Sequence, residues 1–265
     1  MSNEVARSIG SATISFGMVS VPVRIYSAVK DNSIHFNYLH GDGCGSRLSQ
    51  QYVCKKDGAV VSRADMVKGF EVAEDQYIQF TADELKALEE RNTYTIDIDQ
   101  FVPMSKVDPI FFDKPYFLGP NKGGAKAYSL LAQALRSSER VAIAKYASRG
   151  KSYVVMLRPV ADGIVMQTLL YSDEVRSIKD IALDPADIKD AELLLALQLV
   201  AVLAQPDFEP SKYHDEVKVR IEKAINDKIA GNEVVVQNEP AIPQIADLMA
   251  ALKASLAAQP RQVNA

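Results

Sequence analysis

Residues 14–28 read ISFGMVSVPVRIYSA, and their apolar side chains alternate in two runs that are out of phase with each other. The first run consists of Ile14, Phe16 and Met18, and the second of Val19, Val21, Val23 and Ile25. A strand that buries one face keeps a period of two, so the change of phase requires a bend or a short turn. Gly17 permits such a backbone, and Pro22 suits a position whose N–H group is dispensable. The stretch predicts a corner of a strongly curved sheet, such as a barrel.

Short alternating runs separated by turn residues flank this stretch on its C-terminal side. We expect further strands at 33–40, 51–62, 75–80, 93–102, 110–118, 140–148, 151–160 and 163–172. The last three runs are joined by Arg-Gly and Ala-Asp-Gly, which favour tight turns and an antiparallel meander. Strands near both ends of a region of about 170 residues predict a closed barrel, which removes edge strands.

Two helices interrupt these strands. Residues 81–92 open with Thr81 three residues before Glu84, the spacing of a capping box, and their exposed face is acidic. Residues 125–137 carry Tyr128, Leu131 and Leu135 at helical spacing.

After Pro185 the pattern becomes helical. Residues 190–205 are apolar on nearly every side, so we expect them to be buried against the barrel or a second subunit. A helix over 212–230 ends at Gly231, a linker follows at 232–243, and a last helix covers 243–257. The apolar stripe of that last helix consists of Ile245, Leu248, Met249, Leu252 and Leu256.

These patterns predict an α+β protein, with an antiparallel β-barrel core that carries inserted strands and helices and with a C-terminal helical arm. We place the core at 1–180, the helical arm at 181–231, and the linker with its short helix at 232–265. The chain of 265 residues is 48% hydrophobic but has no run of 18 apolar residues and no secretory leader at its start. We therefore expect no membrane span and a cytoplasmic protein. Two cysteines exclude a disulfide framework.

The residues that could support catalysis or metal binding do not form a recognisable site. None of His35, His40 and His214 joins a nucleophile in a local signature, so the pattern does not indicate an enzyme. The loop at 119–124 has the G-x-x-x-x-G spacing of a phosphate-binding loop but lacks the Lys and Ser/Thr that should follow. With Lys122 and Lys126 beside it, it suits either a phosphate or a plain helix entry.

Metal binding is equally poorly supported. His40, Cys44 and Cys54 do not form the close ligand pairs of a structural zinc site. We expect no metal and no cofactor.

Charge is unevenly distributed along the chain, although its net value is only −4. Residues 71–100 hold nine acidic and two basic side chains, and residues 120–160 hold eight basic and one acidic. The eight basic residues are Lys122, Lys126, Arg136, Arg140, Lys145, Arg149, Lys151 and Arg158. Without an aromatic ladder or a recognition helix, they indicate sequence-independent contacts to a duplex backbone. The alternative is a chance cluster of solvated surface charges.

Several stretches resemble the bacterial Ku family of DNA-end-binding proteins. They are ARSIGSATISFGMVSVPVRIYSA at 6–28, IHFNYLH at 34–40, VDPIFFDKPYFLGP at 107–120, FEPSKYHDEVKVRIEKAINDKIAG at 208–231 and IADLMAALKASL at 245–256. The resemblance runs from about residue 6 to 257. Many family members carry additional cysteines around Cys44 and Cys54, which stand alone here.

The resemblance implies a ring-shaped homodimer, non-enzymatic and nucleoid-associated, that is threaded by a double-stranded DNA end. It also implies recruitment of the multifunctional end-joining DNA ligase of non-homologous end joining, with the helices after residue 185 embracing the partner subunit. The stripe of the last helix would dock the ligase or pack back on its own arm.

Two other classes of function remain open from the residues alone. One is a β-barrel small-molecule-binding protein or hydrolase whose acidic segment at 71–100 lines a cleft, and the other is a structural interaction module. Whether a related copy forms heterodimers with this chain also stays open.

Overall fold

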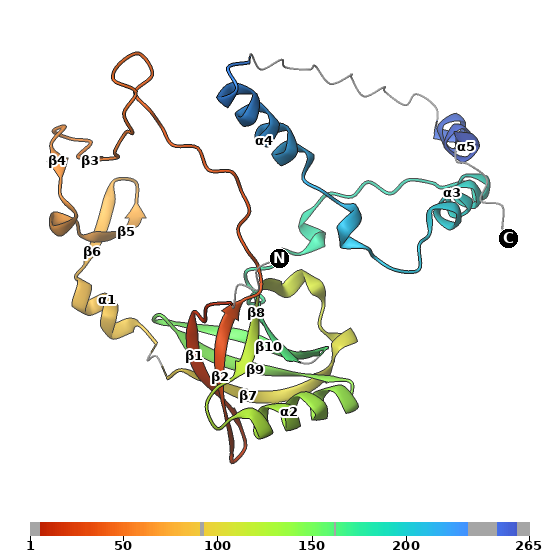
Figure 1. Cartoon of the computed structure of the whole chain (residues 1–265), viewed down its shortest axis with the longest axis horizontal. Coiled ribbons are helices and arrows are strands. Elements are labelled where there is room, and N and C mark those ends of the chain that lie inside the picture. The colour runs from red at the N-terminus through yellow and green to blue at the C-terminus, as the bar shows by residue number, and fades with distance from the viewer. Residues whose placement is uncertain (1–5, 91–92, 162, 233–247, 259–265) are drawn as a thin grey trace. The chain divides into compact units, whose positions relative to one another are not determined.

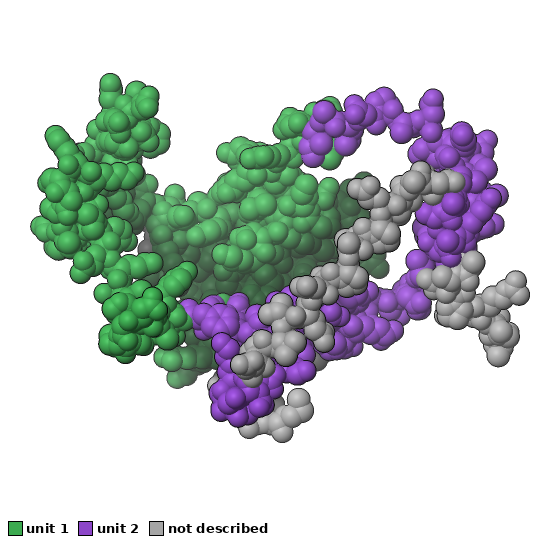
Figure 2. Space-filling view, turned by 90° about the horizontal axis from the view of Figure 1, so that it is seen from above, with its two compact units in different colours: residues 1–32, 37–180 green, residues 33–36, 181–265 purple. Residues whose placement is uncertain are grey.

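The computed structural model describes residues 6–90, 93–161, 163–232 and 248–258. The chain divides into two compact units, one of residues 1–32 and 37–180 and the other of residues 33–36 and 181–265 (Figure 2). The described strands are β1 (Gly10–Phe16), β2 (Val19–Ser27), β3 (Tyr52–Val53), β4 (Val60–Val61), β5 (Lys68–Ala73), β6 (Gln76–Phe80), β7 (Thr95–Pro103), β8 (Phe112–Pro120), β9 (Arg140–Ser148), β10 (Lys151–Val160) and β11 (Gly163–Leu169). The α-helices are α1 (Ala82–Leu88), α2 (Ala125–Ser137), α3 (Asp190–Leu203), α4 (Glu216–Ile229) and α5 (Leu248–Ala258).

The first unit contains a closed barrel with the strand order β1-β2-β8-β11-β10-β9-β7 (Figure 1). Six of the neighbouring pairs are antiparallel, and the barrel closes through a short parallel pair between β1 and β7, in which Ile14 lies opposite Ile96. The predicted barrel and meander are therefore confirmed, with one parallel pair at the seam. Closure leaves no edge strand in this sheet.

The stretch at 14–28 forms a hairpin. β1 and β2 pair from Gly10↔Ile25 to Phe16↔Val19, and Gly17 turns the chain with a φ of 58°. The change of phase thus marks a two-residue turn between two strands instead of a bend within one, and Ile14 and Val21 both reach the core. Pro22 lies one residue before the ladder to β8 begins at Val23, so its missing N–H group breaks no hydrogen bond to β8.

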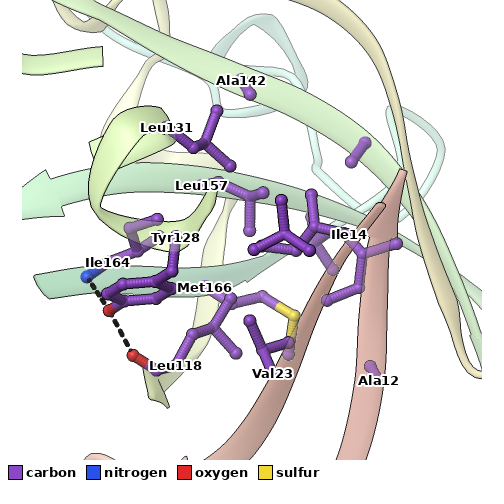
Figure 3. Close-up of a cluster of buried hydrophobic side chains, with 14 of the residues drawn as sticks. Ala12, Ile14, Val23, Leu118, Tyr128, Leu131, Ala142, Leu157, Ile164 and Met166 are labelled. Atoms are coloured by element: carbon purple, nitrogen blue, oxygen red, sulfur yellow. Dashed lines mark hydrogen bonds between the residues drawn. The ribbon is translucent and has the colours of Figure 1, made fainter. Parts of the chain in front are cut away.

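Helix α2 packs against β2, β9, β10 and β11 and fills one end of the barrel. Its apolar face buries Tyr128, Leu131, Ala132 and Leu135 in the same cluster as the inward side chains of the strands (Figure 3). The Tyr128 hydroxyl donates to the Leu118 carbonyl at 2.5 Å and accepts from the Ile164 N–H at 2.8 Å. It thereby links β8 to β11 inside the barrel. Burial raises the pKa of Tyr128, which keeps the phenol protonated as a donor.

Residues 28–94 form a long insertion between β2 and β7. It contains the two-stranded sheets β3-β4 and β5-β6 and the helix α1, whose predicted capping box is present: Thr81 Oγ1 accepts from Glu84 N at 3.2 Å, and Glu84 Oε2 accepts from Thr81 N at 2.8 Å. None of its described residues is buried. The described part of the insertion therefore has no hydrophobic core of its own.

The expected strand at 33–40 is wrong. This stretch has only an isolated bridge between Leu39 and Arg47. Its alternating aromatic residues find no sheet to cover, and Phe36 and Tyr38 remain 70% and 79% exposed. Alternation alone does not make a strand where no neighbouring strand pairs with it.

The second unit is helical. α3 exposes Leu193, Leu197 and Val200 in the single chain, and their expected burial against a second subunit stays a prediction. α5 packs against α3. α4 begins at Glu216 instead of 212, because the Asp215 carboxylate caps the N–H of Lys218 at 3.0 Å. The expected linker lies mostly outside the described residues. No helix in the described ranges has both the length and the apolar composition that a bilayer span requires.

Candidate nucleic-acid interface

The eight predicted basic residues lie on α2, β9, β10 and the loops beside them, but the barrel separates them into groups. β9 is an extended strand with Arg140 at its start and Arg149 just after its end. At about 3.4 Å per residue, these two positions are about 30 Å apart. The charge that is continuous in the sequence is therefore divided in space between the two ends of the barrel and its outer wall.

We name the group at the end covered by α2 the α2-end group. It comprises Lys122, Lys126, Arg136 and Arg140, together with Arg24, which the sequence analysis missed. Arg24 Nε donates to Asn121 Oδ1 at 3.2 Å, and Asn121 Oδ1 also accepts from the Lys122 N–H at 2.9 Å. Arg24 lies nearly 100 positions before Lys122, and only the pairing of β2 with β8 brings them together.

Two arginines of this group donate hydrogen bonds to neighbouring oxygens of the protein. Arg136 donates to the Ala161 carbonyl and to Gln133 Oε1, and Arg140 donates to the Phe101 carbonyl at 3.4 Å. These bonds hold the guanidinium groups in place without neutralising their charge. Since carbonyl and amide oxygens are neutral, both arginines keep a full positive charge for an anionic partner.

The outer wall carries Lys145 and Arg158. Lys145 lies opposite Asp97 of β7 and Val154 of β10, and Arg158 lies opposite Val165 of β11. Lys145 is exposed and Arg158 is half-buried. No ion pair joins any of the eight predicted residues to a carboxylate in the described parts of the chain.

Arg149 and Lys151 flank Gly150 at the β9-β10 hairpin, at the other end of the barrel, and we name them the open-end pair. Arg149 and Gly150 have φ values of 53° and 75°, the backbone of a two-residue turn that favours Asn-Gly. The Glu90 N–H donates to the Gly150 carbonyl at 3.0 Å, and a Cβ added at Gly150 would meet the Glu89 carboxylate. The insertion thus places acidic side chains beside this basic hairpin.

The open end of the barrel holds a cavity of about 420 Å³. Tyrosines from three strands and one loop line it, namely Tyr94, Tyr116, Tyr146 and Tyr153. Arg149, Lys114 and Asp113 also line it. The tyrosines are 22, 30 and 7 positions apart in the sequence, so linear reading finds no aromatic ladder. Closure of the barrel brings the four side chains around one cavity.

Among its described residues, the acidic segment at 71–100 contributes only Tyr94 to this lining, and no carboxylate. This cavity is therefore not the acidic cleft that the hydrolase alternative requires.

Comparison with known proteins identifies the family. The Ku70/Ku80 beta-barrel domain family matches residues 15–194. This chain belongs to the Ku family. The chain is 46% identical to a protein named "Non-homologous end joining protein Ku" from Paraburkholderia phymatum, over 95% of this chain and 83% of that protein. Proteins of the same name from Koribacter versatilis and Heliobacterium modesticaldum are 39% and 36% identical, over 97% and 95% of this chain and 88% and 92% of theirs.

The apolar stripe predicted for partner binding lies on α5 of this Ku-family chain, with Ile245 outside the described residues. Met249, Leu252 and Leu256 are half-buried, and α5 packs against α3. The helix is thus in contact with the arm, while its role in partner binding stays a prediction.

The two cysteines lie in the insertion. Hydrogen bonds from Ser46, with a smaller one from His40, lower the pKa of the exposed Cys44 thiol from 9.0 to about 7. Across the described ranges, no three His, Cys, Asp or Glu side chains gather as a group that could hold a metal ion.

Proposed function

We propose that this protein binds double-stranded DNA ends without sequence preference, as a homodimeric ring threaded by the duplex. It would act in double-strand break repair by non-homologous end joining, at the nucleoid. Family membership carries this proposal, because relatives that match over nearly the whole chain are named for non-homologous end joining. Membership also supports the prediction that the chain is not an enzyme.

Two uncovered apolar surfaces support a dimer. The insertion at 28–94 has no buried residue among those described, and aromatic side chains such as Phe36 and Phe70 are at least 65% exposed. α3 exposes Leu193, Leu194, Leu197 and Val200 by about half or more. Soluble proteins rarely leave such apolar surface uncovered, so we assign both surfaces to the interface with a second copy.

The basic side chains support contact with the sugar-phosphate backbone. They project from a helix, from strands and from a hairpin tip, and none presents a recognition helix for base edges. Phosphate contacts of this kind fix a duplex in place without reading its sequence. Because each contact releases counterions, the affinity should fall steeply with salt.

A comparison of linear and closed-circular duplex tests end binding. The same plasmid-length DNA is offered at equal concentration in the two forms, and binding is followed by gel shift. A protein that threads from an end binds the linear form and leaves the closed circle free. Equal affinity for both forms would refute the threaded ring, and binding to neither would refute DNA binding.

We further propose that α5 recruits the end-joining DNA ligase. Truncation after Pro240 removes α5 and should abolish stimulation of the ligase while DNA binding and the dimer persist. A milder change, Lys253→Glu on the exposed side of α5, tests the surface without removing the helix. Loss of the folded dimer on truncation would instead assign α5 to the packing of its own arm, beside α3.

A further inference from the structure

The barrel is filled at one end and hollow at the other. At the filled end, the side chains of α2 pack into the core. At the other end, the cavity of about 420 Å³ remains between the strands. The interiors of small barrels are normally filled by side chains, because an internal void forfeits packing contacts. A hollow of this size, which lies within the range of about 300–1,000 Å³ typical of ligand pockets, indicates a binding site.

The walls of this cavity combine three kinds of group. Tyr146 and Tyr153 lie directly opposite each other on β9 and β10, and Tyr116 projects from β8. All three are half-buried and pack against the core, so their rings are held by the barrel. None of their hydroxyls has a hydrogen-bond partner among the described residues. Held aromatic rings of this kind are stacking platforms for a flat apolar group.

A carboxylate and two cations lie on the rim, Asp113 beside Lys114 and Arg149 at a different point. Thr168 Oγ1 accepts from the Lys114 N–H at 2.8 Å and lies 3.2 Å from Asp113 Oδ2, which fixes the start of β8 beneath the rim. Arg149 lies two strands away on the β9-β10 hairpin. Asp113 can accept hydrogen bonds from amino groups, while Arg149 can hold a phosphate. Inorganic phosphate has no base, so it would gain nothing from stacking on the tyrosines.

The backbone of Arg149 supports a role for its side chain. Its φ of 53° falls in the left-handed region, where a long side chain is disfavoured and Asn or Gly is preferred. Tyr94, at the same rim, also has a φ of 53°. Strained residues of this kind concentrate at ligand sites, where the side chain repays its conformational cost through binding.

We propose that the open end of the barrel binds one nucleotide, with its base among Tyr116, Tyr146 and Tyr153, its amino edge at Asp113 and its phosphate at Arg149. Two sources supply this chemistry. One is a free nucleoside monophosphate, and the other is the unpaired terminal nucleotide of a DNA end, which rests on the proposed function. We assign a single nucleotide to this cavity, whose volume is about 420 Å³.

Titration of the full chain with dAMP, with inorganic phosphate and with two duplexes tests the proposal. The duplexes share one sequence, one blunt and one with a single unpaired 2-aminopurine nucleotide, whose fluorescence falls when it stacks. We expect dAMP to bind and phosphate not to bind. If DNA ends are the source, the overhang raises duplex affinity by about tenfold, in line with the stacking of one base.

Two variants and a control locate the site. Arg149→Asn keeps a residue that suits the turn, so the melting temperature should hold or rise while dAMP affinity falls at least tenfold. Tyr153→Leu keeps the apolar bulk and should weaken dAMP about fivefold or more by loss of stacking. The control Lys106→Gln removes an exposed cation that neither lines the cavity nor belongs to the predicted DNA contacts, and should leave dAMP binding unchanged.

The outcomes separate this proposal from the proposed function. Binding of dAMP with no gain from the overhang supports the site with a free nucleotide as its source. Blunt-duplex binding with no binding of dAMP and no effect of the overhang overturns the site but leaves end binding intact. Equal affinity for phosphate and dAMP, or wild-type dAMP affinity in both variants, also overturns it. Loss of all duplex binding alongside retained dAMP binding would overturn end binding alone.

Discussion

Replacing Tyr128 by Phe tests whether one hydroxyl ties the filled end of the barrel together. The substitution removes both of its hydrogen bonds and leaves the Leu118 carbonyl and the Ile164 N–H without this partner in the core. Both residues are buried, at 4% and 1% exposed, so water cannot replace the lost bonds. An unsatisfied buried polar group costs about 1–3 kcal/mol, so the two groups predict a loss of about 2–6 kcal/mol in the free energy of unfolding. The ring of Phe keeps the apolar packing of Tyr128, so no cavity adds to this value.

Urea unfolding followed by far-ultraviolet circular dichroism measures the effect. Tyr171→Phe is the matched control. The Tyr171 hydroxyl donates to the Ser152 carbonyl at 2.9 Å, and Tyr171 is 41% exposed. Water can satisfy that carbonyl, so the control should cost less than about 1 kcal/mol. Equal effects of the two variants, or a loss below about 1 kcal/mol for Tyr128→Phe, would refute the role of Tyr128 as a buried link between β8 and β11.

The remaining predictions concern the charges, the arm and the thiol. Reversing Arg149 and Lys151 to Glu together should lower duplex affinity on any sequence. The slope of log K against log salt should fall by about 1.8, at about 0.9 for each lost phosphate contact. An unchanged slope would assign the contacts to the α2-end group, which the double variant Lys122→Glu with Lys126→Glu tests in the same way. The double variant Leu197→Glu with Val200→Glu on α3 should raise the dimer dissociation constant at least about 100-fold, since burying each side chain contributes about 1.5–3 kcal/mol. Sedimentation measures this constant, with Gln198→Glu as the control, and an intact dimer would exclude α3 from the interface. The rate of alkylation of Cys44 should rise with pH around a midpoint near 7, because the thiolate is the reactive form and hydrogen bonds lower the pKa of the thiol. Ser46→Ala should move this midpoint toward 9.0, and an unmoved midpoint would exclude Ser46 as the main cause of the lowered pKa.

The barrel could be predicted from the sequence because its strands are amphipathic and tightly connected. The meander of β9, β10 and β11 begins at each predicted position, since Gly and turn residues separate runs of regular period. The insertion was harder, because residues 33–40 alternate without pairing. Periodicity reports which face a residue would present, but only a neighbouring strand turns that preference into a sheet.

The candidate site was predictable only in part, for a similar reason. The basic residues stand close together in the sequence and were found there, yet β9 separates Arg140 from Arg149 along its length. Conversely, strand pairing alone brings Arg24 beside the loop of Lys122. Closure of the barrel likewise brings together the tyrosines at 94, 116, 146 and 153, which are scattered in the sequence. Long-range pairing creates these groups, and no local pattern encodes it.

Blocking the ends of a linear duplex tests the threaded ring most directly. A biotin at each end receives streptavidin either before the protein is added or after the protein has bound, and the retained protein is measured after a wash in high salt. A ring cannot load past blocked ends and cannot leave once they are closed, so we predict no binding in the first order and salt-resistant retention in the second. Equal, salt-labile binding in both orders would contradict the account.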